Sequence, residues 1–578
     1  MSTPAVVALV AIVLVAVVSA VIGSFGVRMS RSTSDFLVAS RTVGPVANAS
    51  AISGEYLSAA SFLGLAGFIL SDGVDALWFP VASLAGFLAL VLFVAAPLRR
   101  SGAYTVPDFA EVRLGSQQLR GVCTLFVLLI GWIYLLPQLQ SAGFVLTTLT
   151  PLPAWIGVAA SGIVVIVTVV GGGMRSITFV QAFQYWLKLT ALAVPAIIVL
   201  GLFLSDNDPA RTFDRPVAPQ FPVDMTVEVR TDVLLEVTEP VRLTAEGEVD
   251  GELVDGPITW SPGRHEVLAR SSLEFTAGAA VPTVAGAPAT DQEWSEPISG
   301  DEPHQLLEIY SIIIAAVLGV MGLPHVLARF YTNPDGRAAR RTAVVVLAMI
   351  GGFYILVALV GFLSRLYTPQ LLVSGPDAAV LLLPVATLGE SWAAWLFGGL
   401  VAAGAAAAIL ATSSGLMVSL AGVLFTDVLR GRWRDFRFAA VLSGVVPLVP
   451  ALLIPRLDYA VTVPLVFAVA ASTFCPLLVL GIWWRGLTAS GAIAGVLVGG
   501  GLSVCAVATT LFVLPAGWMG VLLLRPAAVT VPAAFLTMIL VSRLSREQVR
   551  TDVDAALLRL HAPERLGLDQ DRVDRGAE

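Results

Sequence analysis

The sequence predicts an all-α polytopic membrane protein with about thirteen transmembrane helices and a small β-rich insertion outside the membrane. Three observations lead to this fold class. Hydrophobic residues make up 57% of the 578 residues and charged residues only 13%, whereas a soluble domain carries about 25% charge. Apolar windows of membrane-spanning length recur along the chain. One long connection, residues 205–305, is instead polar and rich in Asp and Glu.

The apolar windows, each about 20 residues long or longer, have the length that a helix needs to cross a bilayer. They lie near 5–24, 46–71, 76–97, 120–145, 153–172, 178–204, 306–331, 339–364, 392–424, 436–455, 459–483, 488–512 and 526–543. No basic segment precedes the first window, which therefore predicts a retained helix rather than a cleaved signal peptide. The predicted parts are a first helix with its connection (1–45), two core halves (46–204 and 306–483), the insertion (205–305), two peripheral helices (484–543) and a cytoplasmic tail (544–578) with a short amphipathic helix.

Arginines in the short connections predict the orientation, because basic residues favour the cytoplasmic side. One side holds Arg28, Arg31, Arg41, Arg99, Arg100, Arg113, Arg175, Arg337, Arg340, Arg341, Arg430, Arg432, Arg434 and Arg485. The other side holds only Arg365, Arg456 and Arg525. The N-terminus is therefore predicted outside and the C-terminus in the cytoplasm, as an odd number of spans requires.

Residues 205–305 are predicted to form strands. The stretches TVEVRTDVLLEV and HEVLARSSLEF alternate apolar and polar residues, as half-buried strands do. The segment is either a lid or decoration that aids folding, or a part that gates or binds solute. Because its strands come from one contiguous stretch, we expect a self-contained domain away from the permeation path.

Two spans are predicted to be broken. The second contains ISGEYLSAASFLGLAG (52–67), and the seventh contains LGVMGLPHVLARFY (318–331), where Gly322 and Pro324 interrupt the helical pattern. Each break opens a possible five-helix unit, spans 2–6 and spans 7–11, and an odd number of helices inverts one unit relative to the other. Broken helices at matching positions of inverted repeats indicate a midplane binding site in a secondary transporter. The simpler alternative is that Gly and Pro only kink packed helices.

Four stretches carry a resemblance to a known family. They are GEYLSAASFLG (54–64), GGMRSITFVQAFQYWLKLTALAVP (172–195), GLPHVLARFYTNPDGRAARR (322–341) and ILATSSGLMVSLAGVLFTD (409–427). The chain resembles the sodium/solute symporter family, nearest to the bacterial cation/acetate symporters and monocarboxylate uptake permeases. The resemblance implies a five-plus-five inverted-repeat core like that of the leucine transporter. It also implies a multi-pass protein of the bacterial cell membrane.

The implied function is cation-coupled symport of short-chain monocarboxylates such as acetate, propionate or pyruvate, by alternating access. The alternative is a sodium-coupled, proline-like amino-acid symporter of the same family. The implied partners are the carboxylate substrate, the lipid bilayer and a coupling cation, Na⁺ or H⁺, without any other cofactor or metal. The oligomeric state is left open.

The resemblance also implies a sodium site. Its ligands would be the carbonyls of Gly54 and Leu57 at the first break, together with Ala408, Thr412 and Ser413 in the ninth span, with Ser414 as an alternative register. Carbonyls freed by an unwound helix are hard oxygen ligands that suit Na⁺. Hydroxyls on helices more often bond to the preceding turn, which is the competing interpretation.

Donors beside the breaks predict a carboxylate site, since freed N–H groups and positive helix ends attract anions. Hydroxyl candidates are Tyr56, Ser58 and Ser61. Gln138 and Gln184 are weaker candidates, because they are simply polar at membrane depth.

Lys188 is the only lysine of the sequence, and it lies about 15 Å into a span, near the middle of the bilayer. A charge at this depth is costly and usually functional, although a lysine near an interface can extend to water. Lysine, unlike arginine, can lose its proton in a protein. Lys188 is therefore predicted to be a counter-charge for the substrate carboxylate or for Glu55, or an ammonium that occupies a cation site and couples transport to protons.

Glu55 and His325 are further candidate coupling residues. His325 titrates in a useful range, although a packing or hydrogen-bonding role is favoured over a proton relay. Its neighbour Arg329 is predicted to lie at the cytoplasmic end of its span as an anchor.

Other classes of protein fit less well. The sequence has no HExxH, no GxSxG in a suitable setting and no phosphate-binding GK[ST], which argues against an enzyme. Paired breaks favour a carrier over a channel, and the short tail argues against a sensor. A net charge of -7 argues against nucleic-acid binding. Cys123, Cys475 and Cys505 lie in apolar segments and are predicted to be buried, inert thiols.

Overall fold

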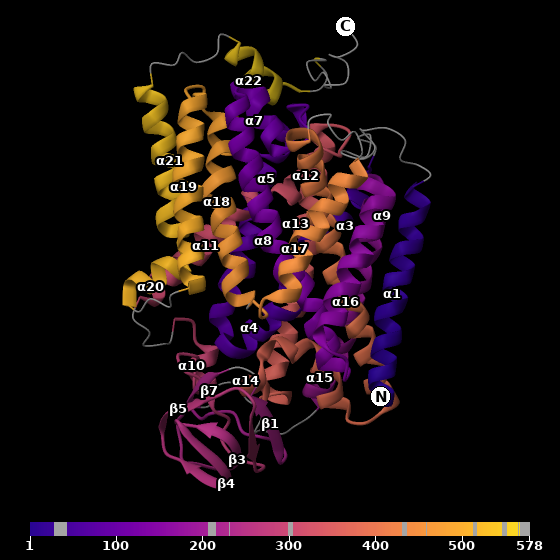
Figure 1. Ribbon diagram of the computed structural model, residues 1–578, viewed down its shortest axis with the longest axis vertical. Helices are drawn as coiled ribbons and strands as arrows, with labels where there is room; N and C mark the ends of the chain where they lie inside the picture. Colours follow the sequence, from indigo (N-terminus) through magenta and orange to yellow (C-terminus); the bar gives the residue numbers. More distant parts are fainter. Residues whose placement is uncertain are drawn as a thin grey trace.

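A computed structural model of the protein describes residues 1–27, 43–205, 216–229, 232–298, 304–429, 436–457, 459–512, 517–545, 552–563 and 566. Long helices stand side by side as a bundle, and one small sheet lies against one end of it (Figure 1). The N-terminus lies at the end that carries the sheet, and the last described helix, α22, lies at the opposite end. Some of the arginines used to predict orientation lie outside the described residues: Arg28, Arg31, Arg41, Arg430, Arg432 and Arg434.

The helices follow the apolar windows closely. The first half of the chain contains α1 (Thr3–Val27), α3 (Pro45–Tyr56), α4 (Leu65–Asp72), α5 (Trp78–Phe93), α6 (Ala95–Arg100), α7 (Val106–Leu114), α8 (Gln117–Leu149) and α9 (Ala154–Ser205). The second half contains α10 (Asp291–Ser295), α11 (Gln305–Gly322), α12 (Pro324–Phe330), α13 (Gly336–Tyr367), α14 (Leu371–Ser374), α15 (Ala379–Leu388), α16 (Trp392–Val423), α17 (Phe436–Leu453), α18 (Tyr459–Trp483), α19 (Ala489–Phe512), α20 (Gly517–Leu524), α21 (Ala527–Leu544) and α22 (Val553–His561). The last of these is the predicted helix of the tail.

Within the described ranges, eleven helical stretches are long and apolar enough to cross a membrane. Two of them, Ala60–Phe93 and Ala154–Ser205, each overlap two of the predicted windows. The all-α polytopic fold class is therefore confirmed, while the count of thirteen spans and the inverted repeat remain predictions. Within α9 the chain kinks at Gly173, whose φ of 59° and ψ of -164° are readily accessible only to glycine.

The insertion contains the predicted strands as one antiparallel sheet. Its strands are β1 (Met225–Val229), β2 (Val233–Val237), β3 (Val241–Val249), β4 (Glu252–Trp260), β5 (Gly263–Val267), β6 (Ser271–Phe275) and β7 (Thr283–Val284). The strand order is β1-β6-β3-β5-β2-β7, with β4 paired to β3. Along β3, Val241, Leu243 and Ala245 are buried while the residues between them are exposed, as a sheet with one covered face requires. The β-rich insertion is thus confirmed.

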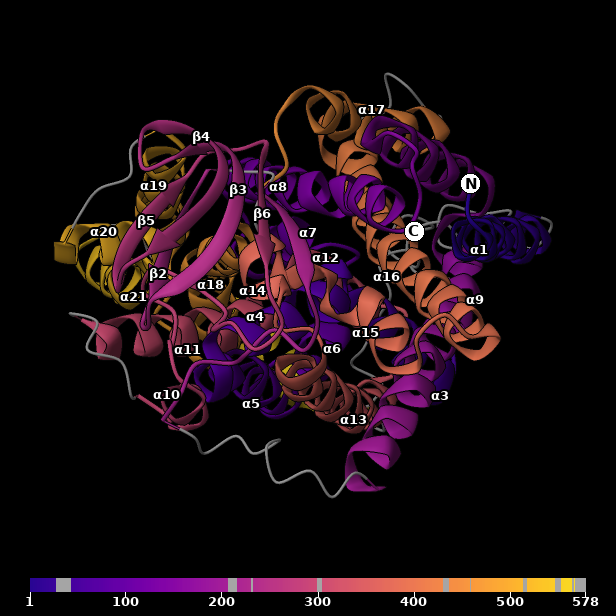
Figure 2. The ribbon, with the colours of Figure 1, turned by 90° about the horizontal axis from the view of Figure 1, so that it is seen from below.

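The covered face of the sheet is not independent of the bundle. Its hydrophobic core includes Leu70 near the end of α4 and Leu371, Leu372 and Val373 of α14. Seen from below, the sheet covers only part of the bundle and leaves α1, α9 and α16 clear (Figure 2). The insertion therefore has its own sheet but shares its apolar core with the ends of membrane helices.

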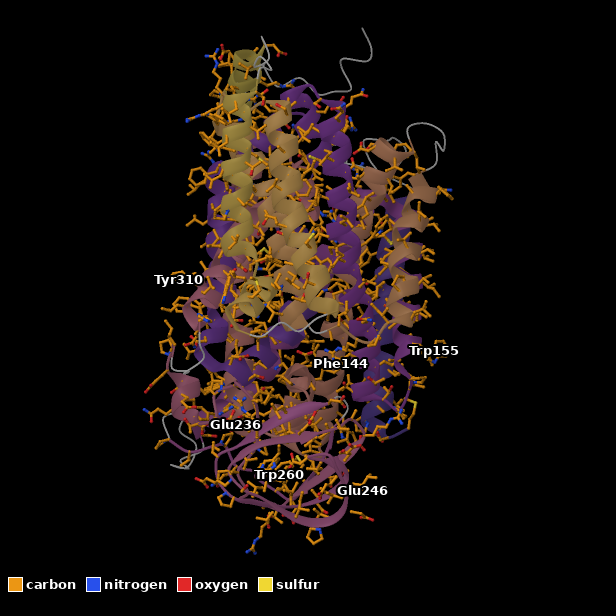
Figure 3. All side chains as sticks on the ribbon, turned by 60° about the vertical axis from the view of Figure 1, so that its left-hand side comes forward. Phe144, Trp155, Glu236, Glu246, Trp260 and Tyr310 are labelled. Carbon is orange, nitrogen blue, oxygen red and sulfur yellow. The ribbon has the colours of Figure 1, made fainter. Side chains whose placement is uncertain are left out.

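Exposed aromatic side chains mark the end of the bundle nearest the sheet. Tyr310 at the start of α11 and Trp155 at the start of α9 are each 61% exposed, and they point outward in the half of the bundle nearer the sheet (Figure 3). Such residues are typical of a membrane–water interface. Of the cysteines, Cys123 and Cys475 are buried as predicted, but Cys505 is exposed because it faces outward from α19.

Candidate functional site

The first break separates α3 from the π-helical turn η2 (Ala60–Gly64). Helix α3 ends at Tyr56, and Leu57 leaves the helical region with φ -74° and ψ 82°. At Gly54 an added Cβ would lie 2.4 Å from the carbonyl oxygen of Gln181. Only glycine therefore lets α3 approach α9 this closely. The carbonyls of Gly54 and Leu57 are turned toward a side chain of α9.

That side chain is Lys188. Its ammonium donates hydrogen bonds to the carbonyl oxygens of Gly54 (2.6 Å) and Leu57 (2.5 Å), and the residue has no exposed surface. Lys188 does not reach an interface, which excludes the interpretation as a lysine extended to water. Its positive charge instead contacts two of the carbonyls that the resemblance assigns to a sodium ion.

A second buried charge cluster lies beside the same break. The guanidinium of Arg329 in α12 donates to a carboxylate oxygen of Glu55 (2.6 Å), to the Thr178 hydroxyl (2.9 Å) and to the amide oxygen of Gln181. The side chains of Arg329 and Glu55 are 1% and 2% exposed. The prediction that Arg329 anchors the end of its span is therefore wrong, since a buried carboxylate draws it inward. Glu55 pairs with Arg329, so Lys188 does not serve as its counter-charge.

Helix α16 also packs against the first break. The Thr412 hydroxyl donates to the carbonyl of Glu55 (2.6 Å), whereas the Ser414 hydroxyl bonds back to Ala411 (3.0 Å). The Ser413 hydroxyl is buried without a partner among the described residues. Ala408 lies buried one turn before Thr412. Of the expected sodium-site residues of α16, Thr412 thus contacts the first break.

The second break separates α11 from α12. Leu323 is extended (φ -67°, ψ 113°) between the last residue of α11 and Pro324, which begins α12. The next residue, His325, is buried, and its ring centroid lies 5.6 Å from that of Tyr134 in α8. Its Nδ1 has no hydrogen-bond partner within the described ranges. His325 thus makes a packing contact and leaves one polar atom unused.

Helix α8 brings two polar side chains to the first break. The Tyr134 hydroxyl lies 3.5 Å from that of Ser58. One turn later, the amide oxygen of Gln138 accepts a hydrogen bond from the backbone N–H of Ala59 (3.2 Å). Gln138 Nε2 is buried and has no partner among the described residues. Gln138 Nε2 is therefore a hydrogen-bond donor beside the break that a ligand could use.

A pocket approaches the breaks from the end that carries the sheet. It has about 590 Å³ of space not filled by protein atoms. Its lining is Tyr56, Ala60, Ser61, Gly64, Leu65, Phe68, Phe79, Tyr134, Ile312, Val463, Pro464, Phe467 and Arg525. The hydroxyl groups of Tyr56, Ser83 and Tyr354 interact electrostatically, yet each is buried without a hydrogen-bond partner of good geometry in the described structure. A group of buried hydroxyls therefore adjoins an otherwise apolar pocket.

A smaller pocket of about 350 Å³ lies on the other side of the second break. It is lined by Pro324 and Ala328 of α12 and by residues of α7, α8 and α16. The two breaks therefore lie between two separate pockets.

The structure brings most of the predicted site residues together, but not all of them. Gln184 donates to the Ser19 hydroxyl of α1 (2.9 Å), which directs it away from the breaks. Sequence reasoning missed Tyr134, Gln181 and Tyr354, and it misplaced Arg329. An arginine in the apolar run after the second break was a usable signal, whereas the tyrosines resembled ordinary core residues. Within the described ranges, no cluster of three His, Cys, Asp or Glu is arranged to hold a metal ion.

The broken helices and the buried site define the class of a secondary transporter, and the comparisons agree with this class. An Na⁺-coupled sialic acid symporter in a substrate-bound outward-open state has a similar fold, with a TM-score of 0.64 at 12% identity over 94% of this chain and 99% of that one. The sequence model of the sodium:solute symporter family matches residues 36–243 and 275–499. The chain belongs to the sodium:solute symporter family. Family and fold are those of transporters, not of enzymes.

Two curated relatives are similar along most of their length. An uncharacterized symporter of Bacillus subtilis is 29% identical over 83% of this chain and 81% of its own. A protein of Corynebacterium glutamicum named monocarboxylic acid transporter is 27% identical over 82% of this chain and 78% of its own.

Proposed function

We propose that this protein imports short monocarboxylates, such as acetate, propionate or pyruvate, by alternating access and with the proton as coupling ion. The observation that carries the coupling is the pair of hydrogen bonds from Lys188 to the carbonyls of Gly54 and Leu57. These carbonyls belong to a break, where backbone oxygens are free to bind a cation.

The ammonium of Lys188 and a sodium ion carry the same charge and need the same oxygens. They cannot share this position without strong repulsion in a medium of low dielectric constant. A lysine can release its proton in the protein interior, which an arginine cannot. We therefore assign to Lys188 the role of a proton carrier. Its ammonium is bound to the two carbonyls while it is charged, and the amine separates from them when it gives up its proton.

The monocarboxylate substrate is supported by the groups around the breaks. Gln138 Nε2 is a donor without a partner among the described residues, Tyr56 at the first break carries a hydroxyl, and a carboxylate in a dry site needs donors. The pocket beyond them is apolar, which suits a short acyl chain. The name of the Corynebacterium relative points to the same substrate class. We assign the carboxylate to the region between Gln138, Tyr134 and Ser58, with Ser61 and Tyr56 toward the apolar pocket.

The substrate is tested by uptake into liposomes that contain the purified protein. Labelled acetate, propionate, pyruvate and proline are offered under an imposed pH gradient without sodium, and separately under a sodium gradient at equal pH. We expect uptake of the three acids driven by the pH gradient alone. Uptake of proline without competition from these acids would contradict the proposed substrate, and an absolute need for sodium would contradict the proposed coupling.

Substitutions of Lys188 test the coupling residue. Lys188→Met roughly keeps the volume of the side chain and removes the charge, so pH-driven uptake should fall by about two orders of magnitude or more. Lys188→Arg keeps a charge that cannot be released and should also abolish proton-driven uptake. Gln184→Met, one turn earlier on α9 and bonded to α1, is the matched control and should retain uptake. Near-normal uptake by Lys188→Met, in protein that melts like the wild type, would overturn the proposal.

A further inference from the structure

The pocket on the sheet side has one charged lining residue among the described residues, Arg525. It lies in the short connection between α20 and α21, at the end of the bundle that carries the sheet (Figure 1). Tyr56 and Tyr134 also line this pocket, and Tyr134 contacts Ser58 and His325. The pocket therefore has in its lining both an arginine near the bundle end and residues of the breaks.

The backbone of Arg525 is fixed to α11. The Ser311 hydroxyl donates to the carbonyl of Arg525 and accepts from the N–H of Ala528 (3.1 Å). The guanidinium then donates to a carboxylate oxygen of Glu308 (3.1 Å), one turn away from Ser311 on α11. Arg525 is thus positioned before any ligand arrives, which lowers the entropy cost of binding.

The two partners of this ion pair differ in exposure. The side chain of Arg525 is only 10% exposed, while that of Glu308 is 43% exposed. A carboxylate that reaches the pocket can replace Glu308 at the guanidinium, because Glu308 can turn into water at little cost. The exchange replaces one carboxylate by another at the guanidinium, so it leaves no buried charge uncompensated.

The negative charge of the protein is a reason for a positively charged group at this pocket. The chain has a net charge of -7, and the sheet carries the exposed Glu246 (Figure 3). Of the other two arginines predicted on this side, Arg365 is buried against Asp291 and Arg456 is paired with Asp377. A small organic anion needs a local positive charge to enter a field of this sign.

We propose that Arg525 is the first binding site of the substrate carboxylate on its way into the protein. The anion displaces Glu308, its acyl chain packs against the contacting rings of Phe79 and Phe467, and it then passes to Tyr134 at the breaks. This inference rests on the proposed monocarboxylate function and adds an entry site that is distinct from the central one. The ligand class is a small carboxylate with an apolar tail.

The test compares Arg525→Gln with wild type in propionate uptake, with KM and maximal rate measured separately. Loss of one charged hydrogen-bond donor should raise KM about tenfold and leave the maximal rate within about twofold. Arg525→Lys should recover part of the loss, and Glu308→Gln should lower KM or leave it unchanged. Arg264→Gln removes the same charge from an exposed position on β5 and is the matched control.

Ionic strength provides a readout that a structural role would not change. KM of the wild type should rise with added salt, because salt screens exposed charges, and the KM of Arg525→Gln should rise much less. A fall in maximal rate with unchanged KM, or equal salt dependence in both proteins, would overturn the inference while leaving the proposed function intact. Calorimetric titration of the purified protein with propionate separates the two ideas: wild-type protein that neither binds nor transports propionate would overturn both.

Discussion

Arg329 carries its charge into the protein interior, and its guanidinium contacts two elements other than its own helix. Its guanidinium bonds to Glu55 of α3 and to Thr178 and Gln181 of α9, and Gln181 donates in turn to Ala411 of α16 (2.7 Å). A buried ion pair of this kind adds little net stability compared with apolar residues, but the removal of one partner leaves an uncompensated charge. The pair therefore fixes how α3 and α12, the first half of one broken span and the second half of the other, meet each other.

This argument predicts unequal effects of single and double substitutions. Glu55→Gln alone leaves the buried Arg329 charge without its carboxylate partner and should destabilise the protein by about 3–5 kcal/mol. The double variant Glu55→Gln with Arg329→Gln should recover more than half of that loss, because no charge is then left unpaired. Thermal unfolding in detergent measures both effects.

The matched control for this prediction is Arg485→Gln, which breaks an ion pair with Asp554. Both of those side chains are about two-thirds exposed, and the loss should be about 1 kcal/mol or less. If Glu55→Gln were no more destabilising than this surface variant, the buried pair would have no structural role.

At the scale of elements, the short helix α10 attaches the insertion to the membrane bundle. It begins with a capping box of Thr290 and Glu293, which stabilises a helix of only five residues. Trp294 in α10 donates to the carbonyls of Ile69 (2.8 Å) and Leu70 (3.0 Å). At Gly73 an added Cβ would lie 1.8 Å from the carbonyl oxygen of Trp294, so α4 ends in glycine where α10 approaches.

The same helix also contacts α13. The ring of Trp294 packs edge-on against Phe362 at 5.2 Å between centroids, and Asp291 pairs with Arg365 at 3.0 Å. Helix α10 thus joins the second half of the broken second span to α13, while the strands lie farther from the breaks. We infer that helix α10, which anchors the insertion, is more important for transport than the strands are.

Two changes separate the anchor from the strands. Replacement of residues 225–284 by a flexible Gly/Ser linker, with α10 retained, should leave measurable uptake. Trp294→Ala should lower uptake several-fold, because it frees the end of α4 from two hydrogen bonds and a large apolar contact. Propionate uptake, corrected for the amount of protein in the membrane, measures both.

Trp260→Ala is the control for this pair of variants. Trp260 is equally buried, at 3% exposed, but lies within the sheet, so its loss should affect the sheet and spare uptake. Complete loss of uptake in a strand-deleted protein that still reaches the membrane would mean that the strands themselves gate or bind solute.

At the scale of the whole molecule, the sheet and the C-terminal helix α22 lie at opposite ends of the bundle (Figure 1). The exposed aromatic residues Tyr310 and Trp155 are near the sheet, and they place one membrane interface between the bundle and the insertion. The arginine distribution predicts that this end faces outward. The described structure fixes the relative positions of the two ends but contains no membrane, so orientation remains a prediction.

Labelling of single cysteines in whole cells tests the orientation. In a background with Cys505→Ala, Leu253→Cys, at a position near the start of β4 that is 89% exposed, should react with a membrane-impermeant maleimide. Ala555→Cys, at an exposed position of α22, should react only after the cells are permeabilised. The buried Cys123 and Cys475 should contribute little signal. The reverse pattern would contradict the orientation predicted from the arginines.

The sequence determined by itself the properties that depend on composition and on local pattern. Apolar windows predicted the membrane helices because a bilayer imposes one length on every span. Alternation predicted the strands of the insertion because one of their faces is covered. Gly322 and Pro324 predicted the second break because they lower helix stability locally. Membership of the symporter family, indicated by four short stretches, is confirmed.

The tertiary structure alone decided which partners the buried charges take. Lys188 was recognisable as an unusual residue, but nothing local showed whether it would meet Glu55, a substrate or the carbonyls of Gly54 and Leu57. Arg329 was placed at a helix end because an arginine usually reaches for water, whereas the fold brings a carboxylate from 274 positions away to its side. Such contacts depend on how distant helices pack, and low dielectric constant makes each of them strong. The spacing of residues along one helix therefore does not predict these contacts.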